Sequence, residues 1–405
     1  MKIPKAAINI INKLNEASYE AYFVGGCVRD MLMGISPKDF DITTSAAPEE
    51  VKKLFKKTVD TGIKHGTVTV VISNESYEVT TYRLDGVYAD FRHPNEVTFT
   101  RDLKEDLKRR DFTVNAIAYH PKEGYIDFFG GKEDIAAKII RGVGNPSLRF
   151  NEDALRMLRA VRFACQLGFD IEEKTFLALK ENSGLISHVS MERIRDELIK
   201  ALTSKYVEKA EYFTNCRLLG CALPFMNDYL QDNFDSFITC LKTLKKDERT
   251  SVNVLSLLFR NYIEEKNIAK HLREMKMDNA AIRSINAVSQ EINREIPCTS
   301  YAVKKTMVTL GVQGFFSLMV CKKACGENVE ALKEIAETVI KLGEPLCIKD
   351  LRINGHVIKE RLGISGILIG ELLRSLHNEI LENPDKNNED YLLSAAAKFV
   401  EDLHN

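Results

Sequence analysis

The pattern of apolar and polar residues changes near Asn151. Before it, a helical spacing over residues 4–17 gives way to alternating strand patterns, at residues 67–72 and 77–82, with glycine, proline and aspartate between them. After it come long amphipathic stretches, among them residues 152–167, 192–202, 331–341 and 365–381. The change predicts an α/β or α+β N-terminal part followed by a remainder that is nearly all helical.

Composition narrows the class of protein. The 405 residues are enough for about two to four domains, and 44% of them are hydrophobic. A run of about eighteen apolar residues is absent, so the sequence predicts no membrane-spanning segment, and the composition excludes a disordered or collagen-like chain. Basic side chains (57) nearly equal acidic ones (58), so any surface that binds a polyanion must be local.

The cysteines and the N-terminus bear on the compartment. The nine cysteines are scattered, with no CxxC pair, which indicates reduced and mostly buried thiols. Proline, asparagine and lysine interrupt residues 1–16 before an apolar core of signal-peptide length can form. We therefore predict a cytoplasmic protein.

A pair of acids follows a glycine turn in residues 22–44. Because residues two apart in a strand share a face, a strand beginning at Asp39-Phe40-Asp41 would project Asp39 and Asp41 together and turn Phe40 to the core. Two carboxylates on one face suit Mg²⁺, which completes its shell with water and substrate phosphates. Alone, such a pair is more often solvated.

The glycine turn supplies the second half of the pattern. Gly25 and Gly26 let backbone N–H groups approach an anion closely at a helix start, and Arg29 adds a positive charge one turn later. A glycine pair is often only a turn, but turn and acids together predict a metal and triphosphate site. Glu78 is a candidate third acid, with an exposed strand glutamate as the equal alternative.

A basic segment at residues 106–116 precedes an apolar run. We assign Arg110 as a triphosphate contact, because arginine binds phosphate oxygens bidentately. An ordinary charged helix end is the alternative, since neighbouring acids nearly balance the bases.

The stretch 152–167 predicts one helix with a polar stripe formed by Asp153, Arg156, Arg159 and Arg162. Asp only accepts and Arg only donates hydrogen bonds, so an Asp153–Arg156 pair complements the amine and unprotonated ring nitrogen of cytosine or adenine. Uracil and guanine present a carbonyl beside a ring N–H, and would leave buried groups unpaired at about 1 to 3 kcal/mol each. The alternative is a surface ion pair between Glu152 and Arg156.

Together these segments resemble a known family. GGCVRD, DFDITT, EVTTYRLDGVYADFRHP, DLKRRDFTVNA and EDALRMLRAVRFA, within about residues 22–200, are similar to the class II tRNA nucleotidyltransferases, the bacterial CCA-adding enzymes, which share a superfamily with bacterial poly(A) polymerases. A weaker similarity covers residues 351–373. The resemblance implies an α+β fold, with a polymerase beta-like nucleotidyltransferase head containing a small mixed β-sheet, and an all-α neck, body and tail.

The resemblance also implies roles for residues and regions. Asp39 and Asp41 would hold Mg²⁺, with Glu78 as a further catalytic acid, and the nucleotide would contact Gly25, Gly26, Arg29, Arg110, Asp153, Arg156, Arg159 and Arg162. The head would span residues 1–150, the neck 151–205, the body 206–296 and a tRNA-binding tail 297–405. ATP, CTP and tRNA are the implied partners, and the oligomeric state stays open between monomer and homodimer.

In this family a flexible loop, here residues 83–97, helps the pocket change from CTP to ATP. Its residues Arg83, Asp85, Tyr88 and the Arg92-His93-Pro94 run are intact, which favours full CCA addition. Lysine groups at residues 242–246 and 304–305 are candidate tRNA contacts, with solvated faces as the alternative.

Rival functions remain at this stage. A poly(A) polymerase and a partial enzyme that adds only CC or only A share the same head chemistry. A nucleotidyltransferase with a small acceptor would not need so long a helical remainder. An RNA-binding protein with a degenerate head is disfavoured by the complete set of candidate site residues.

Overall fold

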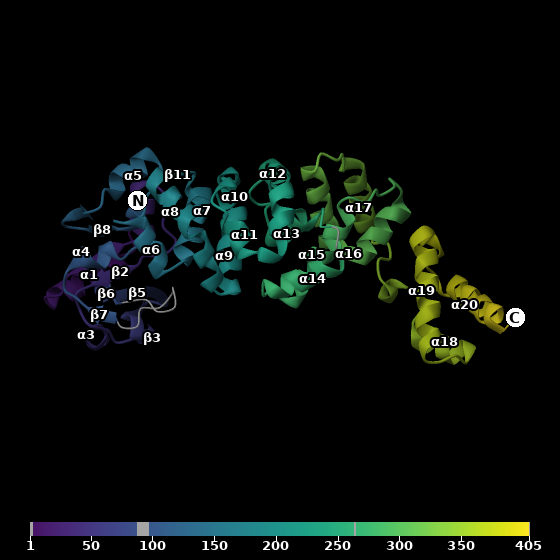
Figure 1. The fold of residues 1–405 in the computed structure, drawn as a ribbon. Helices are drawn as coiled ribbons and strands as arrows, with labels where there is room; N and C mark the ends of the chain where they lie inside the picture. Colours follow the sequence, from purple (N-terminus) through teal and green to yellow (C-terminus); the bar gives the residue numbers. More distant parts are fainter. Residues whose placement is uncertain (1–2, 87–96, 263–264, 405) are drawn as a thin grey trace. The chain divides into compact units, whose positions relative to one another are not determined.

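The structure, a computed structural model, describes residues 3–86, 97–262 and 265–404. The chain divides into two compact units, Met1–Lys242 and Thr243–Asn405, which Figure 1 shows in purple to teal and in green to yellow. None of the helices in the described part of the chain is both long and apolar enough to cross a membrane.

A seven-stranded mixed sheet forms the first part of unit 1, with strand order β3-β4-β5-β2-β1-β8-β9. The strands are β1 Ala21–Val24, β2 Ile42–Thr44, β3 Thr58–Gly62, β4 Thr67–Ile72, β5 Glu75–Thr81, β8 Ile117–His120 and β9 Gly124–Asp127. β2 and β5 run parallel, and the other neighbours run antiparallel. A separate antiparallel pair joins β6 Arg83–Asp85 to β7 Val97–Phe99. The mixed sheet confirms the expected α+β head.

Helices cover both faces of this sheet. Apolar residues of α1 (Lys5–Glu16), α2 (Gly26–Leu32) and α3 (Pro48–Leu54) share one buried cluster with strand residues such as Phe23 and Val79. On the other face, Leu103 and Leu107 of α4 (Leu103–Lys108) pack with Val24. The central strands β1 and β2 are therefore buried on both sides, whereas β3 and β5 also carry exposed residues.

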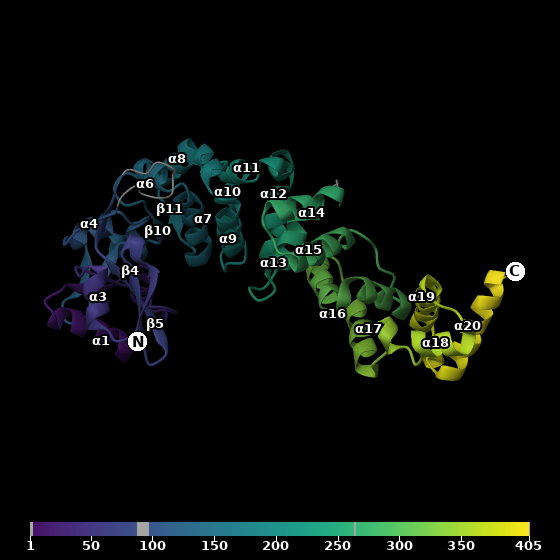
Figure 2. The same ribbon diagram turned by 90° about the horizontal axis from the view of Figure 1, so that it is seen from below.

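The rest of unit 1 is helical, as expected, with one exception. Its helices are α5 Gly131–Ala137, α6 Pro146–Glu152, α7 Leu155–Leu167, α8 Glu173–Asn182, α9 Met191–Leu202, α10 Tyr212–Asn215, α11 Leu218–Ala222 and α12 Asn227–Thr243. The exception is the short strand β11 (Asp170–Ile171), which pairs in parallel with β10 (Ile139–Ile140). α7 packs on α9, and Figure 2 shows the two helices side by side.

Unit 2 is helical throughout its described residues. Its helices are α13 Ser251–Phe259, α14 Glu265–Glu274, α15 Asn279–Glu291, α16 Ser300–Ala324, α17 Glu330–Leu342, α18 Gly355–Leu362, α19 Ile367–Glu382 and α20 Glu389–His404. The stretches expected at residues 331–341 and 365–381 correspond to α17 and α19. The finer division at residues 150, 205 and 296 stays a prediction.

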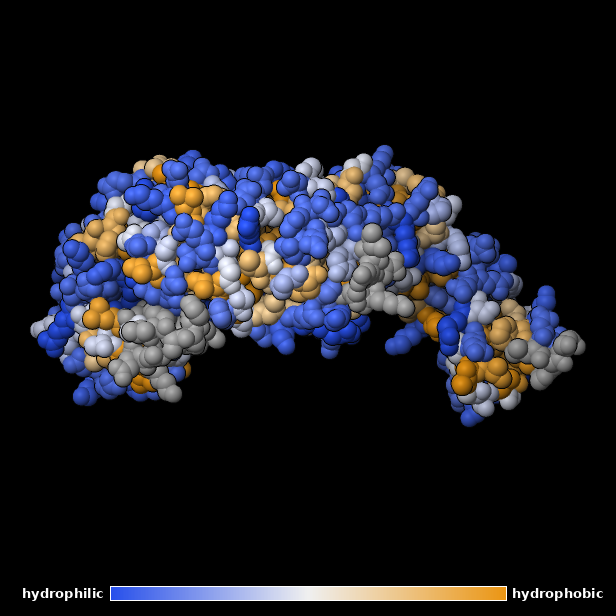
Figure 3. Space-filling view, viewed as in Figure 1, coloured by the Kyte–Doolittle hydropathy of each residue, from blue (hydrophilic) through white to orange (hydrophobic). Residues whose placement is uncertain are grey.

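The surface of unit 2 exposes some apolar side chains. Ile367 and Leu368 begin α19 and are 79% and 40% exposed. Figure 3 shows hydrophobic surface in orange on the part of unit 2 formed by the last three helices. Leu372, Leu376 and Ile380 of the same helix lie in the core, so α19 buries one face only.

Two lysines of α16 are buried, which corrects one expectation. Lys304 pairs with Glu344 at 2.7 Å between Nζ and Oε2, so it forms neither a solvated face nor a basic surface for tRNA. Lys322 donates from Nζ to the carbonyl oxygens of Ile292 (2.8 Å) and Arg294 (2.7 Å), just beyond the end of α15. Each charge is therefore compensated inside unit 2.

We predict that Lys322→Met lowers the free energy of unfolding by about 2 to 4 kcal/mol, because the buried Ile292 carbonyl, the partly buried Arg294 carbonyl and Glu327 lose their donor. Chemical denaturation followed by circular dichroism measures the change. Lys323→Met is the matched control, since the neighbouring side chain is exposed and its pair with Glu330 lies on the surface. Equal stability of the two variants would contradict the prediction.

Candidate active site

The two candidate metal ligands lie just before strand β2. The expected strand starts later than predicted, at Ile42, but the Asp41 carbonyl still accepts a hydrogen bond from the Val24 N–H (3.1 Å) and aligns this segment with β1. Phe40 is buried against Phe23, as predicted, with ring centroids 5.6 Å apart. Asp39 is exposed and Asp41 is partly buried.

Glu78 lies on the neighbouring strand. The parallel register pairs Ile42 with Val79, so Glu78 stands one position earlier, level with Asp41. Burial raises the pKa of the Asp41 carboxyl to about 6, and the negative charges of Asp39 and Glu78 contribute. The three acids are therefore close enough to repel one another.

This crowding fits a cation. Among the described residues no group of three or more acid, histidine or cysteine side chains is arranged to hold a metal. The fit is instead that of Mg²⁺, which needs only one or two carboxylates and takes its remaining ligands from water and phosphate oxygens. A bound cation would relieve the repulsion that raises the pKa of Asp41.

The glycine turn meets these acids and Arg110. Gly25 has φ +78°, a conformation that side chains disfavour, and precedes the first turn of α2. A Cβ at Gly25 would lie 3.2 Å from Arg110 Nη1 and 3.9 Å from Asp41 Oδ2. Arg29 folds back toward the turn, since its Nη2 would lie 3.6 Å from a Cβ at Gly26. The structure thus brings the predicted turn, acids and arginine to one place.

Arg110 has a donor to spare. Its Nη2 lies 3.5 Å from Asp106 Oδ2, and its Nε is buried without a hydrogen-bond partner in the described structure. Burial lowers the pKa of Arg110 from its usual value. A buried guanidinium with an unsatisfied N–H beside a glycine turn suits an anionic ligand such as a phosphate.

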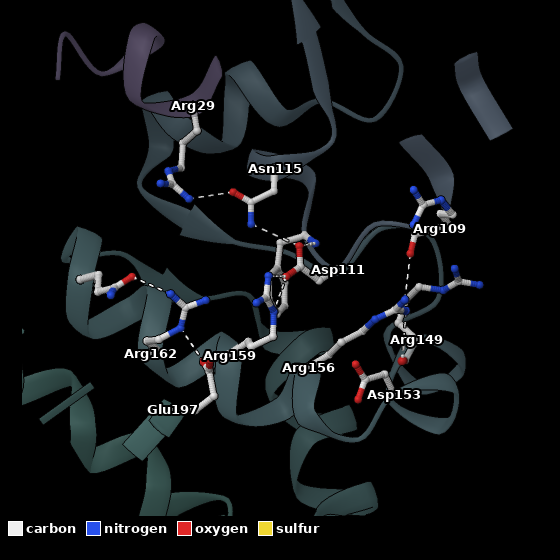
Figure 4. Close-up of polar contacts among 12 residues, drawn as sticks. Arg29, Arg109, Asp111, Asn115, Arg149, Asp153, Arg156, Arg159, Arg162 and Glu197 are labelled. Carbon is white, nitrogen blue, oxygen red and sulfur yellow. Dashed lines mark hydrogen bonds and ion pairs between the residues drawn. The ribbon is translucent and has the colours of Figure 1, made fainter. Parts of the chain in front are cut away.

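A hydrogen-bonded chain runs from α2 to α7, as Figure 4 shows. Arg29 Nη1 donates to Asn115 Oδ1 (2.8 Å), Asn115 Nδ2 donates to Asp111 Oδ1 (3.2 Å), and Arg159 donates to Asp111 Oδ2 from Nη2 (2.6 Å) and Nε (2.8 Å). Burial alone would raise the pKa of Asp111, but the Arg159 guanidinium and these hydrogen bonds lower it to about 2. The sequence analysis gave Asp111 and Asn115 no role.

Asp153 does not lie in the continuous helix expected over residues 152–167. α6 ends at Glu152, Asp153 is extended with φ −136°, and α7 begins at Leu155. Asp153 Oδ1 accepts the Leu155 N–H at 3.1 Å. The backbone break therefore lets this side chain serve the start of α7 while it stays available to a ligand.

Arg156 is anchored on three sides. It donates from Nη2 to the Arg109 carbonyl (2.9 Å) and from Nη1 to the Arg149 carbonyl (3.3 Å) and to Glu152 Oε2 (2.7 Å). The predicted Glu152–Arg156 pair exists, but Arg156 is largely buried and the pair is no surface contact. These contacts hold the guanidinium plane in one orientation (Figure 4).

A cavity of about 230 Å³ unites much of the predicted set. It is lined by Arg109, Arg110, Asp111, Asp153, Leu155, Arg156, Arg159 and Arg193. Arg162 is not among these residues: it forms an ion pair with Glu197 and lies over the Phe163 ring, 4.0 Å from its centroid. The cavity therefore combines several arginine donors with two carboxylates, Asp111, which Arg159 holds, and the partly buried Asp153.

Sequence reasoning missed Arg193. It comes from α9, forty positions after Asp153, and the spacing within an amphipathic helix carries no signal for such a contact. Its Nη2 lies 3.3 Å from Asp153 Oδ2.

The expected flexible loop is described only at its ends. Arg83 begins β6, where its N–H donates to Asp106 Oδ1 (3.3 Å) and its guanidinium donates to the His65 carbonyl. The backbone of Asp85 ends β6. Tyr88 and the Arg92-His93-Pro94 run lie outside the described residues.

Three family models match consecutive parts of the chain. Residues 21–141 match the poly A polymerase head domain, residues 168–230 match the probable RNA and SrmB-binding site of polymerase A, and residues 244–396 match tRNA nucleotidyltransferase domain 2. These matches cover the sheet, the helices after α7 and most of unit 2.

Several proteins of similar sequence or structure are CCA-adding enzymes. The CCA-adding enzyme of Ligilactobacillus salivarius is 37% identical over 98% of this chain and 97% of its own, and that of Streptococcus mutans is 41% identical over 75% and 76%. The crystal structure of the Bacillus stearothermophilus CCA-adding enzyme in complex with CTP has a TM-score of 0.86 and 31% identity, over 99% of this chain and 100% of that one.

We predict that Asp111→Asn lowers the free energy of unfolding by about 2 kcal/mol at pH 7, because the partly exposed Arg159 guanidinium loses the buried carboxylate that balances its charge. The folded-state pKa is about 2, below the usual value of about 3.9, so the carboxylate stabilises the fold above pH 4 and loses this effect as the pH falls toward 2. The gap between variant and wild type should therefore narrow from pH 5 to pH 2.5 in urea titrations.

Asp196→Asn is the control for this comparison. The Asp196 side chain is 52% exposed on α9 and pairs with its neighbour Arg195, so its charge contributes little to stability. A pH-independent gap for Asp111→Asn would contradict the assignment of its carboxylate.

Proposed function

We infer that this chain, which belongs to the family of CCA-adding enzymes, is a tRNA nucleotidyltransferase that adds C, C and A to the 3′ end of tRNA from CTP and ATP without a nucleic-acid template. The observation that carries the assignment to this site is the cavity in which Asp153 and Arg156 adjoin Arg110, whose Nη1 lies beside Gly25, the residue that Asp41 also approaches. In this proposal one nucleotide would contact the base-selecting pair, then the phosphate-binding arginine, then the acid pair.

In this proposal the acid pair positions the reacting groups. Asp39 and Asp41 would hold Mg²⁺, with Glu78 beside them, and the 3′ hydroxyl of the tRNA would attack the α-phosphorus and release pyrophosphate. Bound divalent cations supply a lowered hydroxyl pKa and neutralise the charge of the leaving pyrophosphate. The crowded carboxylates support this role because they are costly to keep together without a cation.

The triphosphate would lie against the glycine turn. Gly25 and Gly26 would leave space for phosphate oxygens, and Arg110 Nη1 lies beside Gly25, where it could donate to them. Arg29 is held by Asn115 and Asp30, so its charge faces the turn from a fixed position. Arg159, fixed by Asp111, adds positive charge to the cavity wall.

Base selection would rest on Asp153 and Arg156. An acceptor beside a donor complements the amine and ring nitrogen of cytosine and adenine, and mismatches uracil and guanine. Arg156 is anchored by two backbone carbonyls and can present only its remaining donors, which supports a fixed reading of the base. Arg162, paired with Glu197, would act indirectly by supporting α7.

The wider setting of the proposal is a cytoplasmic enzyme whose helical parts hold tRNA mainly through phosphates. Lys304 is removed from the candidate contacts by its burial. Lys242 pairs with Glu211 at 3.0 Å but remains partly exposed.

We predict that Asp39→Ala and Asp41→Ala each abolish nucleotide transfer, with a loss of at least about 1,000-fold, because each removes a candidate cation ligand. The measurement is incorporation of labelled CTP into tRNA, with circular dichroism to show that the variants fold. Asp60→Ala is the control: this residue lies on β3 of the same sheet and pairs on the surface with Lys52. Substantial turnover by folded Asp39→Ala enzyme would refute the role of the pair.

A second experiment tests the reaction itself. The purified protein and Mg²⁺ are incubated with tRNA transcripts that end at the discriminator base, at C and at CC, with CTP and ATP offered separately and together. We expect addition to stop after CCA. Arrest at CC with both nucleotides present would refute full CCA addition, an unlimited A tail would indicate a poly(A) polymerase, and no incorporation would indicate an RNA-binding protein.

A further inference from the structure

The side chain that would accept the base amine stands on a break between helices. Asp153 follows the last residue of α6 in an extended conformation and precedes α7, so no helical backbone restricts its direction. Its carboxylate is instead held through both oxygens, Oδ1 by the Leu155 N–H and Oδ2 by Arg193. The direction of this acceptor therefore depends on one backbone group and one side chain.

Arg193 approaches Asp153 from α9, across the packing of α7 on α9. Its Nη2 donates to Asp153 Oδ2 at 3.3 Å, and its Nη1 is buried without a hydrogen-bond partner in the described structure. The side chain also lines the cavity of about 230 Å³. The Arg193 guanidinium is therefore not fully satisfied by protein groups among the described residues.

A purely structural role does not account for these contacts. α7 and α9 are already joined by the Arg162–Glu197 ion pair, and Ile194 and Leu198 of α9 are buried. A long Asp153–Arg193 contact with a spare N–H adds little to that packing. The contact instead restrains Asp153, the carboxylate of the cavity that is not held by a short ion pair such as that between Asp111 and Arg159.

We propose that Arg193 is a positioning residue that determines nucleotide specificity: its guanidinium directs the Asp153 carboxylate toward the exocyclic amine of cytosine or adenine. Asp153 Oδ2 keeps lone-pair capacity for that amine while Arg193 is bound, because a carboxylate offers about four acceptor sites. This inference rests on the proposed function and adds a third residue to its base-selecting pair.

The loss of Arg193 has a specific chemical consequence. Without it, Asp153 is held at Oδ1 alone and its second oxygen can turn away from the base. The other polar groups of the cavity wall are chiefly arginine donors, which complement the carbonyl oxygens of uracil and guanine. The cavity then disfavours the wrong bases less strongly, and CTP and ATP bind more weakly.

The test compares Arg193→Met and Arg193→Lys with wild-type protein. For each we measure kcat/KM with CTP and with UTP on transcripts ending at the discriminator base, and equilibrium binding of CTP without turnover. We expect Arg193→Met to reduce the CTP-to-UTP ratio of kcat/KM about tenfold or more and to raise KM, with kcat at saturation changed less than about threefold. Arg193→Lys, which keeps the charge, should restore part of the ratio.

Arg195→Met is the matched control. Two positions along a helix place Arg195 about 200° round α9 from Arg193, and it pairs with Asp196. Its CTP-to-UTP ratio should equal that of wild type.

An unchanged ratio in folded Arg193→Met and Arg193→Lys proteins, judged by thermal unfolding, would overturn the inference and leave Arg193 a structural residue. Failure of the wild-type protein to incorporate CTP at all would instead overturn the proposed function, so the two failures are distinguishable.

Discussion

The ion pair between Asp111 and Arg159 is the contact on which the site depends. Asp111 lies just before η2 (Thr113–Asn115) in the sheet-containing part of unit 1, whereas Arg159 lies on α7. The Asp111 carboxylate is buried, and burial of its charge would destabilise the fold unless hydrogen-bond and ion-pair partners compensate it. Those partners continue through Asn115 to Arg29 and the glycine turn. One buried charge thereby links the glycine turn to α7.

The sequence was sufficient for features in which local pattern and chemistry agree. The alternating run at residues 67–72 is strand β4, and Phe40 packs inward between two acids. Arg110 contacts the glycine turn because a short motif places basic groups directly after α4. In these cases a few neighbouring residues determine both the backbone and the direction of the side chain.

Other features depended on contacts between distant segments. The periodicity of residues 152–167 gave one helix, because a single extended residue at Asp153 leaves the apolar spacing on both sides nearly unchanged. The contact between Arg193 and Asp153 could not be predicted from the sequence, because it forms only when α9 packs on α7. The sequence around Lys304 indicates a surface charge, because its partner Glu344 lies forty residues later, just after α17. Periodicity predicts which face of a helix is apolar, but it does not predict which charged residue from a distant segment will contact that helix.

The anchoring of Arg156 has a consequence for how the protein can vary. Two of its partners are main-chain carbonyls, those of Arg109 and Arg149, and no substitution at these positions removes a carbonyl oxygen. The orientation of the Arg156 guanidinium therefore depends largely on the path of the backbone. A substitution at position 109 or 149 would therefore remove the Arg109–Asp106 or the Arg149–Glu152 ion pair but would keep the carbonyl oxygen that holds Arg156.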